Sequence, residues 1–354
     1  MLNVVDTQTD WQQEFREAVR KVSELEAILE TKIASTDYPL FIPRQLAFEI
    51  KKAGKDSPLW KQFVPNQDEN HILGMEDPIG DLAHLKKGQL IHRYKNRALF
   101  MPTSICPVLC RYCFRKNELN QEKQIFQSDL KETKKYLEDH PEINEIIFSG
   151  GDPLILSDEK IDQYLDFFSN IKSIKYIRFH SRTPIILPSR INESFISLLE
   201  KWSKQFIKIT IVVHLNHLSE LTDDNQLALQ RLCNLPLQLL SQSVLLKDIN
   251  DDEVSLKQLF EALIRNGIRP YYLHHPDQVK GGMHFSISLE KGRMIYAKLR
   301  DQLPGWAIPQ YIIDIPGGFG KTPAFNPEHL HFTGQFIDRD FKNHQISLNT
   351  LDKY

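Results

Sequence analysis

The sequence lacks the features that define several classes of protein. No apolar run approaches the roughly 20 residues that a membrane-spanning helix needs. The N-terminus, MLNVVDTQTDWQQ, has neither a basic region nor an apolar core, so it does not resemble a signal peptide. The 44 basic residues are balanced by 46 acidic ones, and blocks of like charge are absent, which argues against a nucleic-acid-binding surface. We expect a cytoplasmic protein that acts on a small substrate or binds a specific protein partner.

Cysteine is also scarce, with four in 354 residues. Three of the four, Cys106, Cys110 and Cys113, fall within eight residues. A disulfide framework would be denser and more dispersed along the chain. The distribution therefore favours a reducing compartment and a metal site.

A glycine-rich stretch, DIPGGFGKTP at 314–323, lacks part of the pattern that binds nucleotide phosphates. The first glycine of a P-loop would fall at position 315, which is isoleucine. Pro323 follows Lys321 closely, so the stretch does not open a helix whose N-terminus would face a phosphate. Lys321 must serve another purpose.

The chain is long enough for one large domain with a smaller appended region. In residues 1–90, apolar side chains spaced three and four apart from Trp11 to Leu29 predict one amphipathic helix. A second, short helix is expected to end at Gly54, followed by a proline-containing loop. We expect a helical N-terminal region at 1–90, a barrel at 91–325 and a short C-terminal extension at 326–354.

From about residue 97, short β-rich apolar runs alternate with amphipathic segments of helical length. The predicted strands are 97–104, 145–150, 174–181, 207–215, 238–246, 268–275 and 306–314, and the predicted helices are 127–140, 158–170, 191–204, 220–233, 253–266 and 289–303. Repeated βα units imply a parallel sheet, either an open doubly wound sheet or a full or partial barrel. Polar residues and glycines gather at the end of nearly every strand, which favours a barrel with its chemistry at one mouth.

The motif CPVLCRYC follows the first of these strands. Its Cys-x3-Cys-x2-Cys spacing places three thiolates on one loop, where they can hold three corners of a [4Fe–4S] cube and leave the fourth iron open. Three ordinary thiols and a zinc site are the alternatives. A structural zinc site requires four ligands, and no fourth is obvious nearby.

This cysteine spacing, with an aromatic residue before the last cysteine, resembles the radical S-adenosylmethionine superfamily. The resemblance implies an α/β fold with a partial (β/α)6 TIM-like barrel, and an open iron that binds S-adenosyl-L-methionine. FSGGDPL at 148–154 resembles the glycine-rich element of that superfamily, and its Ser149, Gly150, Gly151 and Asp152 are expected to contact this cofactor.

Further motifs resemble the lysine 2,3-aminomutase family over about residues 80–325. They are HRYKNRALFMPTSICPVLCRYCFRK, FSGGDPL, HSRTPIILPSRI, QSVLLKDIND, RPYYLHHPDQVKGGMHF and IDIPGGFGKTP. Members of this family use a [4Fe–4S] cluster, S-adenosylmethionine and pyridoxal 5′-phosphate. By match, Lys321 forms the Schiff base with pyridoxal phosphate.

The resemblance also implies roles for charged residues. Arg93 and Arg97 match the pair that clamps the phosphate of pyridoxal phosphate, for which paired guanidinium donors are suited. Arg115 matches the partner of the substrate α-carboxylate. Asp277 and Asp314 match two aspartates that hold the distal ammonium of lysine. Such a role suits aspartate, because a buried ammonium requires an opposite charge.

Three more residues, Arg182, His214 and Gln242, match contacts to S-adenosylmethionine. The glycines between Asp314 and Lys321 are expected to turn the backbone so that the carboxylate faces substrate while the amine faces pyridoxal phosphate.

The implied activity moves the α-amino group of L-lysine, or of a related amino acid, to the β-carbon. It requires an electron donor such as flavodoxin or ferredoxin. YYLHHPDQVKGGMHF resembles the branch that makes (R)-β-lysine for modification of elongation factor P, whereas DIPGGFGK resembles the catabolic branch. Residues 322–354 contain no cysteine, so the structural zinc of longer catabolic members is not expected and a homo-oligomer is left open. A radical enzyme without pyridoxal phosphate and a non-catalytic iron–sulfur or nucleotide-binding protein are the competing hypotheses.

Overall fold

The computed structural model describes residues 10–86, 90–119, 129–326 and 334–346. Its main feature is a sheet of ten strands that pair in the order of the sequence. The central seven strands are parallel, each bonded to the next. They are β3 Arg97–Thr103, β4 Glu145–Gly150, β5 Tyr176–Ser181, β6 Lys208–His214, β7 Gln238–Val244, β8 Arg269–His274 and β9 Gln310–Ile315. All seven predicted strands are present.

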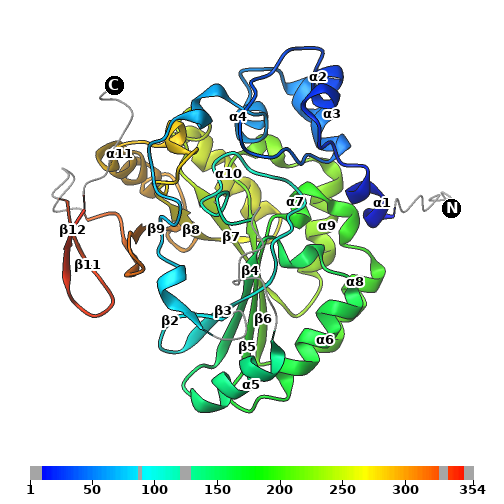
Figure 1. Cartoon of the computed structure of the whole chain (residues 1–354), viewed down its shortest axis with the longest axis vertical. Helices are drawn as coiled ribbons and strands as arrows, with labels where there is room; N and C mark the ends of the chain where they lie inside the picture. Colours follow the sequence, from blue (N-terminus) through cyan, green and yellow to red (C-terminus); the bar gives the residue numbers. More distant parts are fainter. Residues whose placement is uncertain (1–9, 87–89, 120–128, 327–333, 347–354) are drawn as a thin grey trace.

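Six crossover helices connect these strands around the outside of the curved sheet (Figure 1). They are α5 Leu130–Asp139, α6 Asp158–Ser169, α8 Glu193–Ser203, α9 Asp223–Cys233, α10 Glu253–Arg265 and α11 Leu289–Arg300. Each is preceded by a polar residue whose side chain accepts a backbone N–H of the first turn, and each such cap contributes about 1 kcal/mol. The predicted partial (β/α)6 barrel is confirmed. The start of the first predicted helix, at 127 and 128, lies outside the described residues.

Short helices lie in the connections at the barrel mouth and elsewhere. They are η1 Gln67–Asn70, η2 Leu82–His84, η5 Pro153–Ile155, α7 Thr183–Ile186, η6 Pro188–Arg190, η7 Leu218–Glu220, η8 Met283–Phe285 and η9 Gly305–Ala307.

The core lies between the sheet and these helices. Phe100 of β3 packs edge-on against Phe148 of β4 and against Tyr164 and Phe168 of α6, with its ring centroid 5.0 to 5.5 Å from theirs. All four side chains are buried, and burial of each phenylalanine contributes about 1.5–3 kcal/mol. Aromatic packing of this kind fixes the strand ends that carry the site.

The described part of the N-terminal region contains, besides η1 and η2, four α-helices, α1 Trp11–Arg16, α2 Val22–Leu29, α3 Arg44–Ala53 and α4 Pro58–Phe63. Helices α2 to α4 lie together at the top of Figure 1. The prediction of one helix from Trp11 to Leu29 is wrong, because the backbone of Val19 pairs with that of Ile42 and interrupts the helix. Gly54 ends α3 as predicted, but the following loop contains α4, whose first turn is capped by Ser57.

Antiparallel strands flank the parallel sheet at both edges. On one side lie β1 Leu85–Lys86 and β2 Leu90–Tyr94, and on the other lies β10 Gly320–Pro323. Among the described residues, no strand pairing joins β10 to β1 or β2, so the barrel is open on this side. A separate hairpin, β11 Gln335–Ile337 and β12 Asn343–Gln345, follows. None of the helices in the described ranges is long and apolar enough to cross a membrane.

Candidate active site

A cavity of about 260 Å³ lies at the carboxyl ends of the parallel strands. Every predicted site residue lines it, although these residues come from positions more than 200 apart in the sequence. They are Arg93, Arg97, Cys106, Cys110, Cys113, Arg115, Ser149, Gly150, Gly151, Asp152, Arg182, His214, Gln242, Asp277, Asp314 and Lys321. The fold therefore brings the whole predicted set to one mouth.

The cysteine loop follows β3 and is held from both sides. The N-terminal region contacts it through backbone bonds from Leu109 to Phe41 and from Arg111 to Gln62. On the other side the loop packs on the glycine-rich turn after β4, where a Cβ at Gly151 would meet the Ile105 carbonyl oxygen at 2.2 Å. Only glycine fits at this position.

The cysteine arrangement suits a cluster better than a single ion. No three His, Cys, Asp or Glu side chains of the described residues are grouped so that they could hold one metal ion. The three thiolates of a cubane bind three different irons, so their sulfurs need not converge on one point, as the ligands of zinc must. Burial raises the pKa of Cys113 to about 12, so a cationic metal is needed to hold it as a thiolate.

Asp152 follows the two glycines, and its carboxylate is hydrogen-bonded to other groups of the protein. It accepts hydrogen bonds from the Ser181 hydroxyl at 2.7 Å and from the backbone N–H groups of Arg182 at 2.7 Å and Thr183 at 3.0 Å. Asp152 thus orders the turn after β5 that carries Arg182.

An alternating row of six charges runs from the cysteine loop to β10, and we call it the ion chain. Its members, in order, are Glu118, Arg115, Asp81, Arg93, Asp314 and Lys321. All side chains except that of Lys321 are at most 6% exposed.

Asp81 occupies the middle of the ion chain. Its carboxylate pairs with Arg115 and, at 2.5 Å, with the Arg93 guanidinium. Asp81 belongs to the irregular segment before β1, and no periodicity or motif of the sequence singled it out. Asp81 and Glu118 are the two members of the ion chain that the sequence did not predict.

Asp314 and Lys321 were expected to face different groups, but in the structure they pair with each other. They are direct cross-strand partners in the β9–β10 hairpin, so both side chains lie on one face, and Lys321 Nζ donates to Asp314 Oδ2 at 2.6 Å. Burial opposes ionisation of Asp314, but Lys321 and His274 hold its pKa below the ordinary value. The pKa of Lys321 is raised, because Asp314 outweighs the effect of burial.

Asp277 lies beyond β8 and forms no salt bridge with any cationic side chain in the part of the chain that the structure describes. Burial, and then the charge of Asp314, raise its pKa to about 8. A carboxyl group that is neutral near pH 7 beside an ionised one can accept a cation without leaving excess negative charge.

Several polar atoms around the cavity are buried without a hydrogen-bond partner. They are Arg93 Nε, Arg115 Nε, Arg182 Nε, His180 Nε2 and Asp314 Oδ1. Buried polar groups are almost always bonded, so this concentration indicates a place for polar ligands. Unpartnered guanidinium N–H groups suit the phosphate of pyridoxal phosphate and carboxylates, and so fit the implied cofactors.

The other predicted cationic and polar residues have protein partners. Arg97 lies 4.0 Å above the Tyr94 ring. The His214 ring nitrogen lies 2.7 Å from the Tyr112 hydroxyl. Gln242 hydrogen-bonds His180, which the sequence analysis did not select although it lies in the HSRTP motif.

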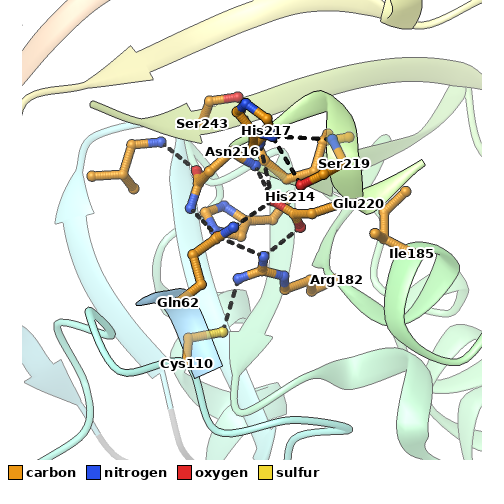
Figure 2. A network of polar contacts seen from close by, with 12 residues as sticks. Gln62, Cys110, Arg182, Ile185, His214, Asn216, His217, Ser219, Glu220 and Ser243 are labelled. Atoms are coloured by element: carbon orange, nitrogen blue, oxygen red, sulfur yellow. Dashed lines mark hydrogen bonds and ion pairs between the residues drawn. The ribbon is translucent and has the colours of Figure 1, made fainter. Parts of the chain in front are cut away.

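Arg182 belongs to a second buried group, the Arg182 network, shown in Figure 2. Its members are Arg182, Cys110, Gln62, Asn216 and Glu220. Gln62 comes from α4 and Glu220 from η7, so the N-terminal region reaches the barrel mouth here.

A comparison with protein families supports the assignment of the cysteine loop to an iron–sulfur cluster. A family profile described as a 4Fe-4S single cluster domain matches residues 96–182. Among solved structures, Streptococcus suis SuiB bound to S-adenosylmethionine is 20% identical with a TM-score of 0.47, over 66% of this chain and 54% of that one. The chain thus spans about half of that protein, and a likeness at this level supports no conclusion about the site.

Similarity to curated proteins is far stronger. L-lysine 2,3-aminomutase of Escherichia coli (strain K12) is 35% identical over 89% of this chain and 94% of its own length. The proteins of the same description from Methanococcus maripaludis and Buchnera aphidicola are 33% and 34% identical, over 90% and 88% of this chain and 76% and 94% of their lengths. With identity of this extent and the cysteines and Lys321 at one cavity, the chain belongs to the lysine 2,3-aminomutase family.

Proposed function

We propose that this chain is a radical aminomutase that converts L-lysine to β-lysine. One observation carries the proposal: a single cavity is lined by the three cysteines, by Lys321, and by buried side chains of both charges. A diamino acid presents one carboxylate and two amino groups, so a site for it needs cationic and anionic groups at separate places. The ion chain offers both.

The bound groups supply the chemistry of hydrogen abstraction and of nitrogen migration: the cluster with S-adenosylmethionine provides the radical, and pyridoxal phosphate provides a conjugated ring that spreads the unpaired electron. The protein holds them through the cysteines, through Lys321 and through Arg93 and Arg97. Placement is its main contribution, since a C–H bond must lie close to the radical while water is excluded.

Arg115 is the proposed partner of the substrate carboxylate. Its Nε has no hydrogen-bond partner, and its other donors already face Asp81 and Glu118, which fix its orientation. Asp277 and Asp314 are the proposed partners of the distal ammonium. Because the pKa of Asp277 is raised to about 8, binding of an ammonium there releases a proton from this carboxyl.

Lys321 must lose its proton before its nitrogen can bond covalently to pyridoxal phosphate. Its salt bridge to Asp314 opposes that loss, because the carboxylate raises the pKa of the amine. Once Lys321 is no longer a cation, Asp314 loses its salt-bridge partner. Its carboxylate then becomes available to a substrate ammonium. The hairpin therefore favours loading of the cofactor before the amino acid.

The proposal also covers the domain organisation, the electron donor and the cellular location. Residues 1–90, 91–325 and 326–354 form the N-terminal region, the catalytic barrel and a short extension. An external one-electron donor, such as a flavodoxin or ferredoxin, reduces the cluster. The enzyme acts in the cytoplasm.

The test is anaerobic reconstitution with iron, sulfide and pyridoxal phosphate, followed by reduction and incubation with L-lysine and S-adenosylmethionine. The expected product is β-lysine, and chromatography of its enantiomers separates the (R) branch from the catabolic branch. Cys110→Ala is the matched control and should return lysine unchanged. If the wild-type protein leaves lysine intact but isomerises another amino acid, the roles given to Asp277 and Asp314 are wrong.

A further inference from the structure

The guanidinium of Arg182 has one fixed position beside the cysteine loop. Arg182 caps α7 immediately after β5, and the residue is 5% exposed. Its Nη1 donates to Cys110 Sγ at 2.9 Å and to the Tyr112 hydroxyl, and its Nη2 donates to Gln62 Oε1 at 3.0 Å and to Glu220 Oε2 (Figure 2). Nε alone has no hydrogen-bond partner, so it is the atom left for S-adenosylmethionine.

Gln62 and Glu220 are themselves fixed by further hydrogen bonds. Gln62 Nε2 donates to Glu220 Oε1 at 3.1 Å, and Gln62 Oε1 also accepts from Asn216 Nδ2 at 3.0 Å. Glu220 Oε1 accepts the backbone N–H groups of Asn216 at 2.8 Å and His217 at 3.0 Å. Gln62 is fully buried and Glu220 is 4% exposed. Rotation of the guanidinium would leave buried charges unpaired, which is strongly unfavourable.

The Arg182 N–H that faces Cys110 Sγ is therefore held in a fixed position, where it can change the electron density on this sulfur. A hydrogen bond to a ligand sulfur withdraws electron density from the cluster and stabilises the reduced state, in which one more electron is present. The charge of Arg182 is balanced by Glu220, so the effect depends on the direction of this N–H rather than on a net positive charge.

We propose that Gln62 and Glu220 are positioning residues that hold an Arg182 N–H on Cys110 Sγ and thereby raise the reduction potential of the cluster. The electron itself comes from the external one-electron donor. The inference does not depend on the amino-acid substrate, because it concerns only the cluster loop and its surroundings.

The experiment measures the reduction potential of the reconstituted cluster without S-adenosylmethionine or lysine, by following the electron paramagnetic resonance of the reduced state during an anaerobic redox titration. Gln62→Met keeps the side-chain length but removes the acceptor, and Glu220→Asp keeps the charge but withdraws the carboxylate from the guanidinium. In each variant we expect the ratio of reduced to oxidised cluster at a fixed potential to fall about tenfold, a shift of about 59 mV for one electron.

Asn225→Ala is the matched control. Asn225 is equally buried in the same region and donates to the carbonyl oxygens of Glu220 and Ile185, but it has no hydrogen bond to the guanidinium. It should reduce the yield of folded protein without changing the ratio. The signal comes only from molecules that hold a cluster, so partial misfolding lowers its amplitude and leaves the potential unchanged.

Two results would overturn the proposal. One is a wild-type ratio of reduced to oxidised cluster in the cluster-bearing fraction of either Gln62→Met or Glu220→Asp. The other is a shift in Asn225→Ala as large as theirs, which would assign the effect to general loosening of the fold. Failure of the aminomutase assay alone leaves the proposal standing, because the titration requires no turnover.

Discussion

The ion chain and the Arg182 network both bury charged side chains at the barrel mouth, but they differ in how completely these are satisfied. In the ion chain, Arg93 Nε, Arg115 Nε and Asp314 Oδ1 lack hydrogen-bond partners. In the Arg182 network, every side-chain nitrogen and oxygen of Gln62, Asn216 and Glu220 has a hydrogen-bond partner, and only Arg182 Nε is left. Incomplete satisfaction marks a surface that awaits ligands, whereas complete satisfaction marks one that holds its own geometry.

The largest effect is expected at the end of the ion chain. Lys321→Ala removes the amine that bonds to pyridoxal phosphate, and turnover should fall on the order of 10⁴-fold or more. Lys321→Arg keeps a cation beside Asp314 and is the control for loss of the salt bridge. Borohydride reduction followed by peptide mapping should locate the cofactor on residue 321 in the wild-type protein only. Retention of covalent cofactor in Lys321→Ala would contradict the assignment.

The next largest effect is expected at the centre of the ion chain. Asp81→Asn leaves Arg93 and Arg115 without their shared carboxylate, which should destabilise the cofactor-free protein by about 3 kcal/mol or more. Pyridoxal phosphate brings a dianion to Arg93, so it should restore much of this loss. Thermal unfolding with and without the cofactor measures both effects.

Glu220→Gln, in the Arg182 network, sharpens the comparison. It should also destabilise the protein, but pyridoxal phosphate should not restore its stability more than that of the wild type. Equal rescue of Asp81→Asn and Glu220→Gln would mean that the two regions do not differ in the way described.

A smaller effect concerns pH and substrate. Below its pKa of about 8, Asp277 must lose a proton to accept an ammonium, so lysine affinity should rise with pH up to that value, about tenfold per unit. Asp277→Asn should bind lysine more weakly, and the slope of log Kd against pH should be smaller by about one. Calorimetric titration of the cofactor-loaded protein measures both slopes. Parallel slopes would show that Asp277 does not face the substrate.

The smallest effect concerns a histidine of the scaffold. Burial lowers the pKa of His275 to about 3, and its ring bonds the Tyr311 hydroxyl at 2.8 Å. Unfolded histidine titrates near pH 6.5, so this group stabilises the fold above that pH and the contribution is lost as pH falls towards 3, at about 1.4 kcal/mol per pH unit. His275→Gln should reduce the acid sensitivity of denaturant unfolding by that slope, with or without lysine. A change that depends on lysine would place His275 in the site instead.

The sequence predicts the barrel well because its signals are local. Each strand is a short apolar run that ends in glycine or polar residues, and each crossover helix starts at a capping side chain, so neighbouring residues suffice. The helix from Trp11 to Leu29 fails for the opposite reason: the bridge between Val19 and Ile42 is a tertiary contact that overrides helical periodicity.

The candidate site divides in the same way. Cysteine spacing and the resemblance place the ligands and Lys321 at the mouth, since these residues belong to contiguous motifs. Asp81, Gln62 and Glu220 lie in no such motif. Gln62 and Glu220 are 158 positions apart, and only folding brings α4 against η7. Residues that orient a site through other residues carry little signal in a single sequence.

The open side of the barrel has one more consequence. Among the described residues, β2 and β10 face each other across it without backbone pairing. The Tyr94 hydroxyl of β2 accepts the Lys321 backbone N–H of β10 at 2.8 Å, and Arg93 of β2 contacts Asp314 of the neighbouring strand β9. This seam can widen or narrow at the expense of side-chain contacts alone, with every ladder of the sheet intact. Among the described strands, this is the place where the circumference of the barrel can change without breaking a ladder, between the strands that carry Arg93 and Lys321.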